Sequence, residues 1–202
     1  MSDASHRGLG IALLVEGGLG LAALGVGWLL GHWPAIGIGG HVPAAEQLLA
    51  IGWGLVATLP PLAALAVMDR VPIPSLEKVK DLALNAIRQI FPQPRWWQLA
   101  LVAAAAGFGE ELLFRGLVQA GLANLIGQPA GPWVALVAAS LVFGLFHWLN
   151  TTYALLAVVA GLYFGGLLIV TGSLWPPIVA HALYDFIALC YLLRPTQVIE
   201  LP

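Results

Sequence analysis

The sequence predicts an all-α fold, that of a polytopic helical membrane protein, and three observations point to it. Apolar residues make up 60% of the 202 residues, and the mean hydropathy is +0.90. Charged residues make up only 9%, whereas a soluble domain typically contains about 25%. The segment 116–184 contains no Asp, Glu, Lys or Arg. Because such a chain cannot cover a water-facing surface, lipid is its expected solvent, where helices satisfy the backbone internally.

Six apolar segments each approach the roughly 20 residues that a helix needs to cross the hydrocarbon core. The first is too long for the apolar part of a signal peptide and lacks a small-residue cleavage site, so we expect it to remain as a helix. We expect one helical membrane domain over residues 1–202, with two spans and a loop in 1–95 and a core in 96–194. The predicted spans are 9–31, 47–68, 97–122, 132–149, 152–171 and 174–193.

The loop between the second and third spans predicts an amphipathic helix. Ser75 is its expected N-cap, and Pro92 and Pro94 end it. Such a helix suits the membrane interface, and a short connector helix that faces solvent is the alternative. Its apolar side recurs at helical spacing through Leu76, Val79, Ala83, Ile87 and Ile90.

The same loop holds five of the eight basic residues of the chain: Arg70, Lys78, Lys80, Arg88 and Arg95. By the positive-inside rule it is expected to be cytoplasmic. Six spans then return both termini, with Arg7 and Arg194, to the cytoplasmic side. We therefore expect an integral protein of the plasma (inner) membrane.

Charge and cysteine content exclude two classes of protein. With a net charge of -2 and a pI near 6.2, the chain offers no basic field for nucleic acid. The single cysteine, Cys190, excludes an intrachain disulfide framework. Ser140, Ser173 and Cys190 have no base at helical spacing, and the metalloprotease pattern H-E-x-x-H is absent.

Ionisable residues inside membrane spans are candidates for function, because burying them in lipid is costly. Glu111 and Arg115 lie four apart and can pair on one helix face, whereas Glu110 points about 100° away. His181 and Asp185 are also four apart and share a face. The sequence therefore predicts a polar site inside the bundle. The polar residues of spans three, four and six are Glu110, Glu111, Arg115, His147, Asn150, His181 and Asp185.

Simpler structural roles exist for several of these residues. His147 near a helix end could be an interface residue, and the Glu111–Arg115 pair could be a structural clamp. Glu16, a carboxyl inside the first span, receives no role. Depth is a further constraint, because Glu110 lies about 20 Å along the third span, whereas His147 ends the fourth. The two meet if the interface lies near Glu110 or if the turn at Asn150 lies within the membrane.

Two chemistries suit a carboxylate and two histidines. Glu110 and His147 could hold and deprotonate a water, while His181, with a donor from Asp185, stabilises an oxyanion. Alternatively, Glu110, His147 and His181 could ligate a zinc ion that activates the water. The sequence permits both, so the cofactor is either none or zinc.

The stretches "EELLFRG", "FGLFHWLN" and "GSLWPPIVAHALYD" resemble the CPBP family of intramembrane proteases, which includes CAAX prenyl endopeptidases and bacteriocin-processing, immunity-associated or abortive-infection-like proteins. Its motifs E-E-x-x-x-R, F-x-x-x-H and H-x-x-x-Asn/Asp occur here in order, over about residues 97–193. The residues that meet them are Glu110, Glu111 and Arg115, then Phe143 and His147, then His181 and Asp185.

This resemblance implies cleavage of peptide bonds at or within the membrane, in a site open to the cytosol. Glu110 would be the base and His147 its partner on the water, with His181 and Asp185 on the oxyanion side. The supporting residues would be Glu111, Arg115 and Asn150.

Three functions are compared. The first is an intramembrane endopeptidase that acts on a membrane-anchored or C-terminal peptide substrate. The second is a non-catalytic membrane scaffold, or an immunity or assembly factor, that retains the protease fold. A transporter with a proton relay is disfavoured because the chain lacks the internal repeat common in such folds. Membrane lipid and a peptide or membrane-protein substrate are the expected partners, and the first two spans are a candidate surface for a protein partner.

Overall fold

A computed structural model describes residues 3–39 and 41–193, and their regular structure is entirely helical. The all-α prediction is thereby confirmed. Arg194, predicted to be cytoplasmic, lies outside the described residues. The elements are α1 (Asp3–Leu29), α2 (Ala44–Ala57), α3 (Leu59–Arg70), α4 (Pro74–Ile90), α5 (Trp96–Glu110), η1 (Glu111–Gln119), α6 (Ala120–Ile126), α7 (Gly131–Phe146), α8 (Thr151–Thr171) and α9 (Trp175–Leu192).

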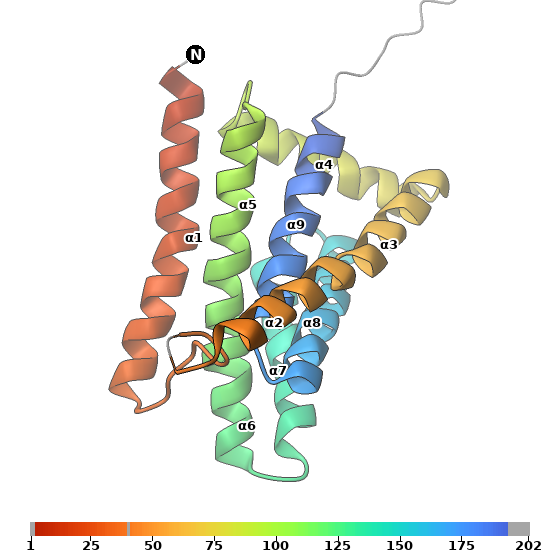
Figure 1. Ribbon diagram of the computed structural model, residues 1–202. Helices are drawn as coiled ribbons and strands as arrows, with labels where there is room; N and C mark the ends of the chain where they lie inside the picture. The colour runs from red at the N-terminus through yellow and green to blue at the C-terminus, as the bar shows by residue number, and fades with distance from the viewer. Residues whose placement is uncertain (1–2, 40, 194–202) are drawn as a thin grey trace, which may run out of the picture.

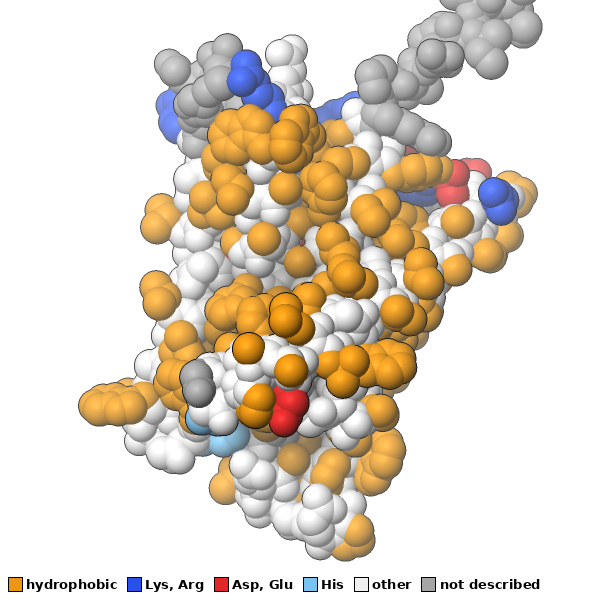
Figure 2. Space-filling model, in the orientation of Figure 1, with side chains coloured by type: hydrophobic (Ala, Val, Ile, Leu, Met, Phe, Trp, Pro, Cys, Tyr) orange, Lys and Arg blue, Asp and Glu red, His pale blue; other side chains and the backbone are white. Residues whose placement is uncertain are grey.

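Four helical segments are long and apolar enough to cross a membrane: Arg7–Leu29, Ala44–Arg70, Thr151–Thr171 and Trp175–Leu192. The surface agrees with a lipid solvent, since hydrophobic side chains cover the broad middle of the face in Figure 2. Burying this much apolar surface in lipid is favourable, whereas exposing it to water is not. The chain is an integral, polytopic helical membrane protein.

The other two predicted spans have a different form. Span 97–122 falls within a continuous helical run, α5–η1–α6, which carries charged residues at its centre. Span 132–149 becomes the shorter α7, of 16 residues. It ends at Phe146 because Asn150 begins the next helix: the Asn150 side chain accepts a hydrogen bond from the Tyr153 backbone N–H at 2.8 Å, as an N-cap does.

The predicted second span is divided between α2 and α3, which run diagonally across the bundle in Figure 1. Pro60 and Pro61, in the first turn of α3, supply no backbone N–H, which interrupts the helical hydrogen bonds. The Thr58 hydroxyl donates to the Gly54 carbonyl at 2.9 Å and closes the end of α2. Gly54 also contacts α9, where an added Cβ would come within 2.6 Å of Val179.

The amphipathic helix is confirmed as α4, in which Val79 is buried and charged residues face outward. Its start differs from the prediction: Ile73, in extended conformation, precedes Pro74, and Ser75 lies inside the first turn. Proline at the first helical position is favourable because its missing N–H would have no partner there. Lys80 of α4 pairs with Asp69. Figure 1 places α4 at the end of the bundle where α1 begins and α9 ends.

The centre of the bundle is α5 with η1, which α1 and α9 flank on either side (Figure 1). Small residues let these helices approach closely. A Cβ at Gly109 of α5 would overlap the carbonyl oxygen of Glu16 in α1, and a Cβ at Gly107 would lie 2.8 Å from Ala182 of α9. These contacts surround the region in which the charged residues of span three lie.

Candidate active site

The central helix changes its winding where the glutamates lie. Glu110 is the last residue of α5, and from Glu111 to Gln119 the chain forms a π-helical segment. Such segments, closed by i→i+5 hydrogen bonds, are rare and occur frequently at functional sites. The side chains at this junction are enclosed: Glu110, Glu111 and Arg115 are 8%, 0% and 1% exposed.

Glu111 and Arg115 form the ion pair that their spacing predicts. The Arg115 Nη1 lies 2.9 Å from Glu111 Oε1, and both side chains are buried. The Arg115 carbon Cζ also lies 4.4 Å from the ring centre of Phe143 and 5.6 Å from that of Phe164. A buried cation requires such compensation, because isolated charges are expensive in a low-dielectric interior. The charge of Arg115 is thus balanced by Glu111.

His181 lies between the two glutamates of the central helix. Its Nδ1–H donates to Glu111 Oε1 at 2.8 Å, and its Nε2 lies 3.9 Å from Glu110 Oε2. The same Nε2 is 3.4 Å from Asp185 Oδ2, so the predicted pairing of these residues on one face of α9 is confirmed. Phe164 stacks on the imidazole at 4.8 Å between ring centres. The sequence predicts only Arg115 as a partner of Glu111, so the hydrogen bond from His181 to Glu111 is seen only in the structure.

His147 reaches the site from the end of α7. Its Nδ1–H donates to the Phe143 carbonyl at 2.9 Å, which leaves Nε2 as an acceptor. This Nε2 lies 3.6 Å from Glu110 Oε2, too far for a direct hydrogen bond. Phe143 also packs against the His147 ring at 4.2 Å between centres, which explains the spacing of the F-x-x-x-H pattern.

The early end of α7 accounts for the depth at which these groups meet. Glu110 lies about 21 Å along α5 from Trp96. Because α7 already ends at Phe146, His147 lies at the same depth as Glu110 and faces it. Residues from the predicted spans three, four and six therefore come together. Asn150 instead caps α8, where its side chain accepts a hydrogen bond from the Tyr153 backbone N–H.

Two further residues near the site did not emerge from the sequence analysis as members of it. Tyr153, in the first turn of α8, lies 6.4 Å from His147 between ring centres. Glu16 of α1 lies next to the central helix, where its backbone contacts Gly109, the residue before Glu110. The sequence signal for Glu16 was a carboxyl inside an apolar span; Tyr153 carried no comparable signal.

The ligand set of the zinc alternative does not fit the arrangement. Among residues 3–39 and 41–193, no group of three or more His, Cys, Asp or Glu side chains could hold a metal ion. We therefore derive no step through a metal.

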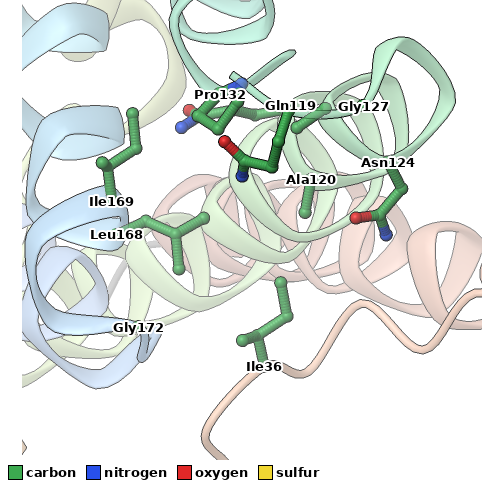
Figure 3. Close-up of a pocket in the computed structure, with 11 residues that line it drawn as sticks. Ile36, Gln119, Ala120, Asn124, Gly127, Pro132, Leu168, Ile169 and Gly172 are labelled. Carbon is green, nitrogen blue, oxygen red and sulfur yellow. The ribbon is translucent and has the colours of Figure 1, made fainter. Parts of the chain in front are cut away.

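A pocket of about 480 Å³ lies away from these residues, between the π-helical segment, α6 and the end of α8 (Figure 3). Ile36, Leu168 and Ile169 form apolar walls, and Gln119 and Asn124 supply amide groups. We call the side chains joined by these ion pairs the Glu110 cluster: Glu110, Glu111, Arg115, His147, His181 and Asp185. None of them lines the pocket. The candidate active site is the Glu110 cluster and not this pocket.

Comparison with known proteins supports the same region. Residues 92–187 match the family model described as "Type II CAAX prenyl endopeptidase Rce1-like". No curated protein and no solved structure matches the chain. The matched segment contains every residue of the Glu110 cluster from Glu110 to Asp185, whereas α1, α2, α3 and α4 precede it. Through residues 92–187, the chain belongs to the Rce1-like family of type II CAAX prenyl endopeptidases, which is part of the CPBP family.

Proposed function

We propose that this protein is an intramembrane endopeptidase that hydrolyses a peptide bond of a membrane-anchored or C-terminal substrate with an activated water. One observation carries the proposal: Glu110 Oε2 faces Nε2 of His147 at 3.6 Å and Nε2 of His181 at 3.9 Å. The adjacent Glu111 is held by Arg115, so Glu110 is the carboxyl left for chemistry. Family membership supports this class of reaction.

Glu110 and His147 would position the water. His147 donates from Nδ1 to the Phe143 carbonyl, so its Nε2 accepts a hydrogen bond. The carboxylate of Glu110 is a second acceptor, close enough for one water to donate to both. As the water oxygen forms a bond to the carbonyl carbon of the substrate, Glu110 takes its proton as general base.

His181 would stabilise the negative charge that develops on the carbonyl oxygen. In the imidazolium form, Nδ1–H donates to Glu111, and Nε2–H would donate to the oxyanion in the substrate complex. Asp185, 3.4 Å from Nε2, orients the ring. Glu111 and Arg115 act indirectly, as positioning residues that hold His181.

Collapse of the tetrahedral intermediate completes the reaction. The carbonyl re-forms, the C–N bond breaks, and the protonated Glu110 gives its proton to the departing amine. The products are a new carboxyl group and a new amino group, and Glu110 returns to the carboxylate form.

The membrane arrangement that we propose has six crossings. The run α5–η1–α6 would be the third and α7 the fourth, within a single domain over residues 1–202. Lys and Arg side chains gather at the α4 end in the view of Figure 2, which supports a cytoplasmic location for that end by the positive-inside rule. The site would then open to the cytosol from the plasma membrane.

The test is peptide cleavage by the purified protein in liposomes, with a panel of transmembrane and C-terminally lipidated peptides. Glu110→Gln and His147→Ala should each lower the rate about 100-fold or more, while both proteins unfold at the same denaturant concentration as the wild type. Glu77→Gln, an exposed carboxyl on α4, is the matched control and should retain full activity.

Repeating the assay with a strong chelator distinguishes the metal-free mechanism from the zinc mechanism. We expect cleavage to continue in the presence of the chelator. Loss of activity that zinc restores would contradict the metal-free mechanism. If the wild type cleaves no peptide and also leaves a native membrane partner intact, the non-catalytic scaffold takes the place of the endopeptidase.

A further inference from the structure

The shortest polar contact of His181 is the hydrogen bond from its Nδ1–H to Glu111 Oε1, at 2.8 Å. Its Nε2 lies 3.4 Å from Asp185 Oδ2 and 3.9 Å from Glu110 Oε2, beyond a normal N–H···O length. The bond to Glu111 holds Nδ1 in place but leaves the ring able to tilt about that bond. The χ2 torsion of histidine adds little restraint, because its energy minima are broad. The direction in which Nε2 points therefore depends on the side chains packed against the ring.

Phe164 of α8 provides a flat surface on which the His181 ring lies. The two rings are nearly parallel, with 11° between their planes and 4.8 Å between their centres. Phe143 contacts the same imidazole with its edge, with 75° between the planes and 6.2 Å between the centres. A tilt of the imidazole would drive it into the stacked phenyl ring, which a close-packed interior does not allow. Phe164, which is 2% exposed, therefore fixes the plane of the imidazole.

Two polar side chains of the π-helical segment hold α8 at the level of Phe164. The Arg115 Nη2 donates to the Gly161 carbonyl at 3.4 Å. One turn further on, the buried Gln119 donates from Nε2 to the Gly165 carbonyl at 3.1 Å. Gln119 packs so closely on α8 that a Cβ added at Gly165 would lie 2.4 Å from its Oε1. Because the two glycines precede and follow Phe164, these contacts fix the position of its ring relative to the central helix.

We propose that Phe164 is a positioning residue for His181 and that Gln119 keeps Phe164 in place. The inference rests on the proposed endopeptidase function, in which His181 Nε2–H meets the oxyanion. A donor to an oxyanion acts only when it is aimed at the position that the developing charge will occupy. The stacked ring keeps Nε2 on the side of Glu110, where the water attacks. Neither Phe164 nor Gln119 belongs to the three sequence motifs of the family.

The first test measures kcat and KM of Phe164→Leu, because leucine keeps the apolar packing but has no ring face. We expect kcat to fall by about 10- to 100-fold, while KM stays unchanged. This split follows because the substrate still binds but the transition state loses an aligned donor. Phe91→Leu is the matched control: it removes another buried phenylalanine, at the end of α4, and should leave both constants unchanged.

Gln119→Met is a second variant, which keeps the argument testable if Phe164→Leu does not fold. Methionine has about the length of glutamine but cannot donate to the Gly165 carbonyl. We expect kcat to fall by about tenfold, again with KM unchanged, because α8 and the Phe164 ring are held less firmly.

The second test follows the Nδ1–H of His181 by NMR of the histidine-labelled protein in nanodiscs, and it does not depend on cleavage. The chain has five histidines, and His181→Gln identifies the signal. In the wild type we expect a proton protected from exchange with water, because it is buried and bonded to Glu111. The protection should be lost in Phe164→Leu and kept in Phe91→Leu.

The two tests separate this inference from the proposed function. Loss of protection in Phe164→Leu alone supports the positioning role even if the wild type cleaves no peptide. The inference is overturned by an unprotected His181 proton in the wild type, or by one that stays protected in Phe164→Leu. An unchanged kcat in Phe164→Leu, or equal losses in Phe164→Leu and Phe91→Leu, overturns it as well.

Discussion

Replacing Arg115 by methionine removes the guanidinium from a buried ion pair, and we expect a large loss of stability. The Arg115 and Glu111 side chains are 1% and 0% exposed and lie 2.9 Å apart. Removing one partner of a buried pair costs about 3–5 kcal/mol, because the remaining charge is uncompensated. Loss of the contact with the Phe143 ring, 4.4 Å away, adds up to about 2 kcal/mol.

Two features of the site limit this loss. The bond from His181 Nδ1 to Glu111 remains and compensates part of the carboxylate charge. Methionine fills much of the volume of the arginine stem, so the cavity left behind is small. The expected net cost for Arg115→Met is therefore about 3–5 kcal/mol.

The assay is reversible unfolding in mixed micelles, titrated with a denaturing detergent. Wild type, Arg115→Met, Glu111→Gln and the double variant form a cycle, and Arg88→Met, at an exposed position on α4, is the matched control. Because the double variant leaves no unpaired charge, its cost should fall below the sum of the single costs by about 1–3 kcal/mol. A cost for Arg115→Met below about 1 kcal/mol, or strictly additive costs, would refute the reasoning.

Two substitutions test the geometry around the site. Gly109→Ala should destabilise the protein by about 1–3 kcal/mol, since the new Cβ overlaps the Glu16 backbone; Gly10→Ala, where a Cβ meets nothing within 4 Å, should have no destabilising effect in the same unfolding assay. Asn150→Ala removes the cap of α8 and should cost about 1 kcal/mol. It should also lower cleavage through the adjacent turn that holds His147, whereas unchanged stability would contradict the capping role.

Several features of the structure were visible in the sequence but were not used. Pro60 and Pro61 marked the interruption that divides the second predicted span into α2 and α3. Asn150 is a good N-cap residue, and its position signalled that α7 ends before residue 149. These signals are local, and the apolar composition outweighed them because a span is predicted from its mean hydropathy over many residues.

The sequence by itself determined the class of protein, the amphipathic α4 and the pairing within helices. Glu111 with Arg115 and His181 with Asp185 could be predicted because residues four apart share one helix face, whatever the rest of the chain does. The three motifs likewise identified the family that residues 92–187 match.

Only the tertiary structure decided which helices meet. The bond between Glu111 and His181 joins residues 70 positions apart, and α1 packs on α5 through the close contact of Gly109 with the backbone of Glu16. The π-helical segment Glu111–Gln119 was also not predicted, because the prediction assumes 3.6 residues per turn along the whole span. The physical reason is that contacts between helices depend on the packing of whole helix faces, which periodicity within one segment does not specify.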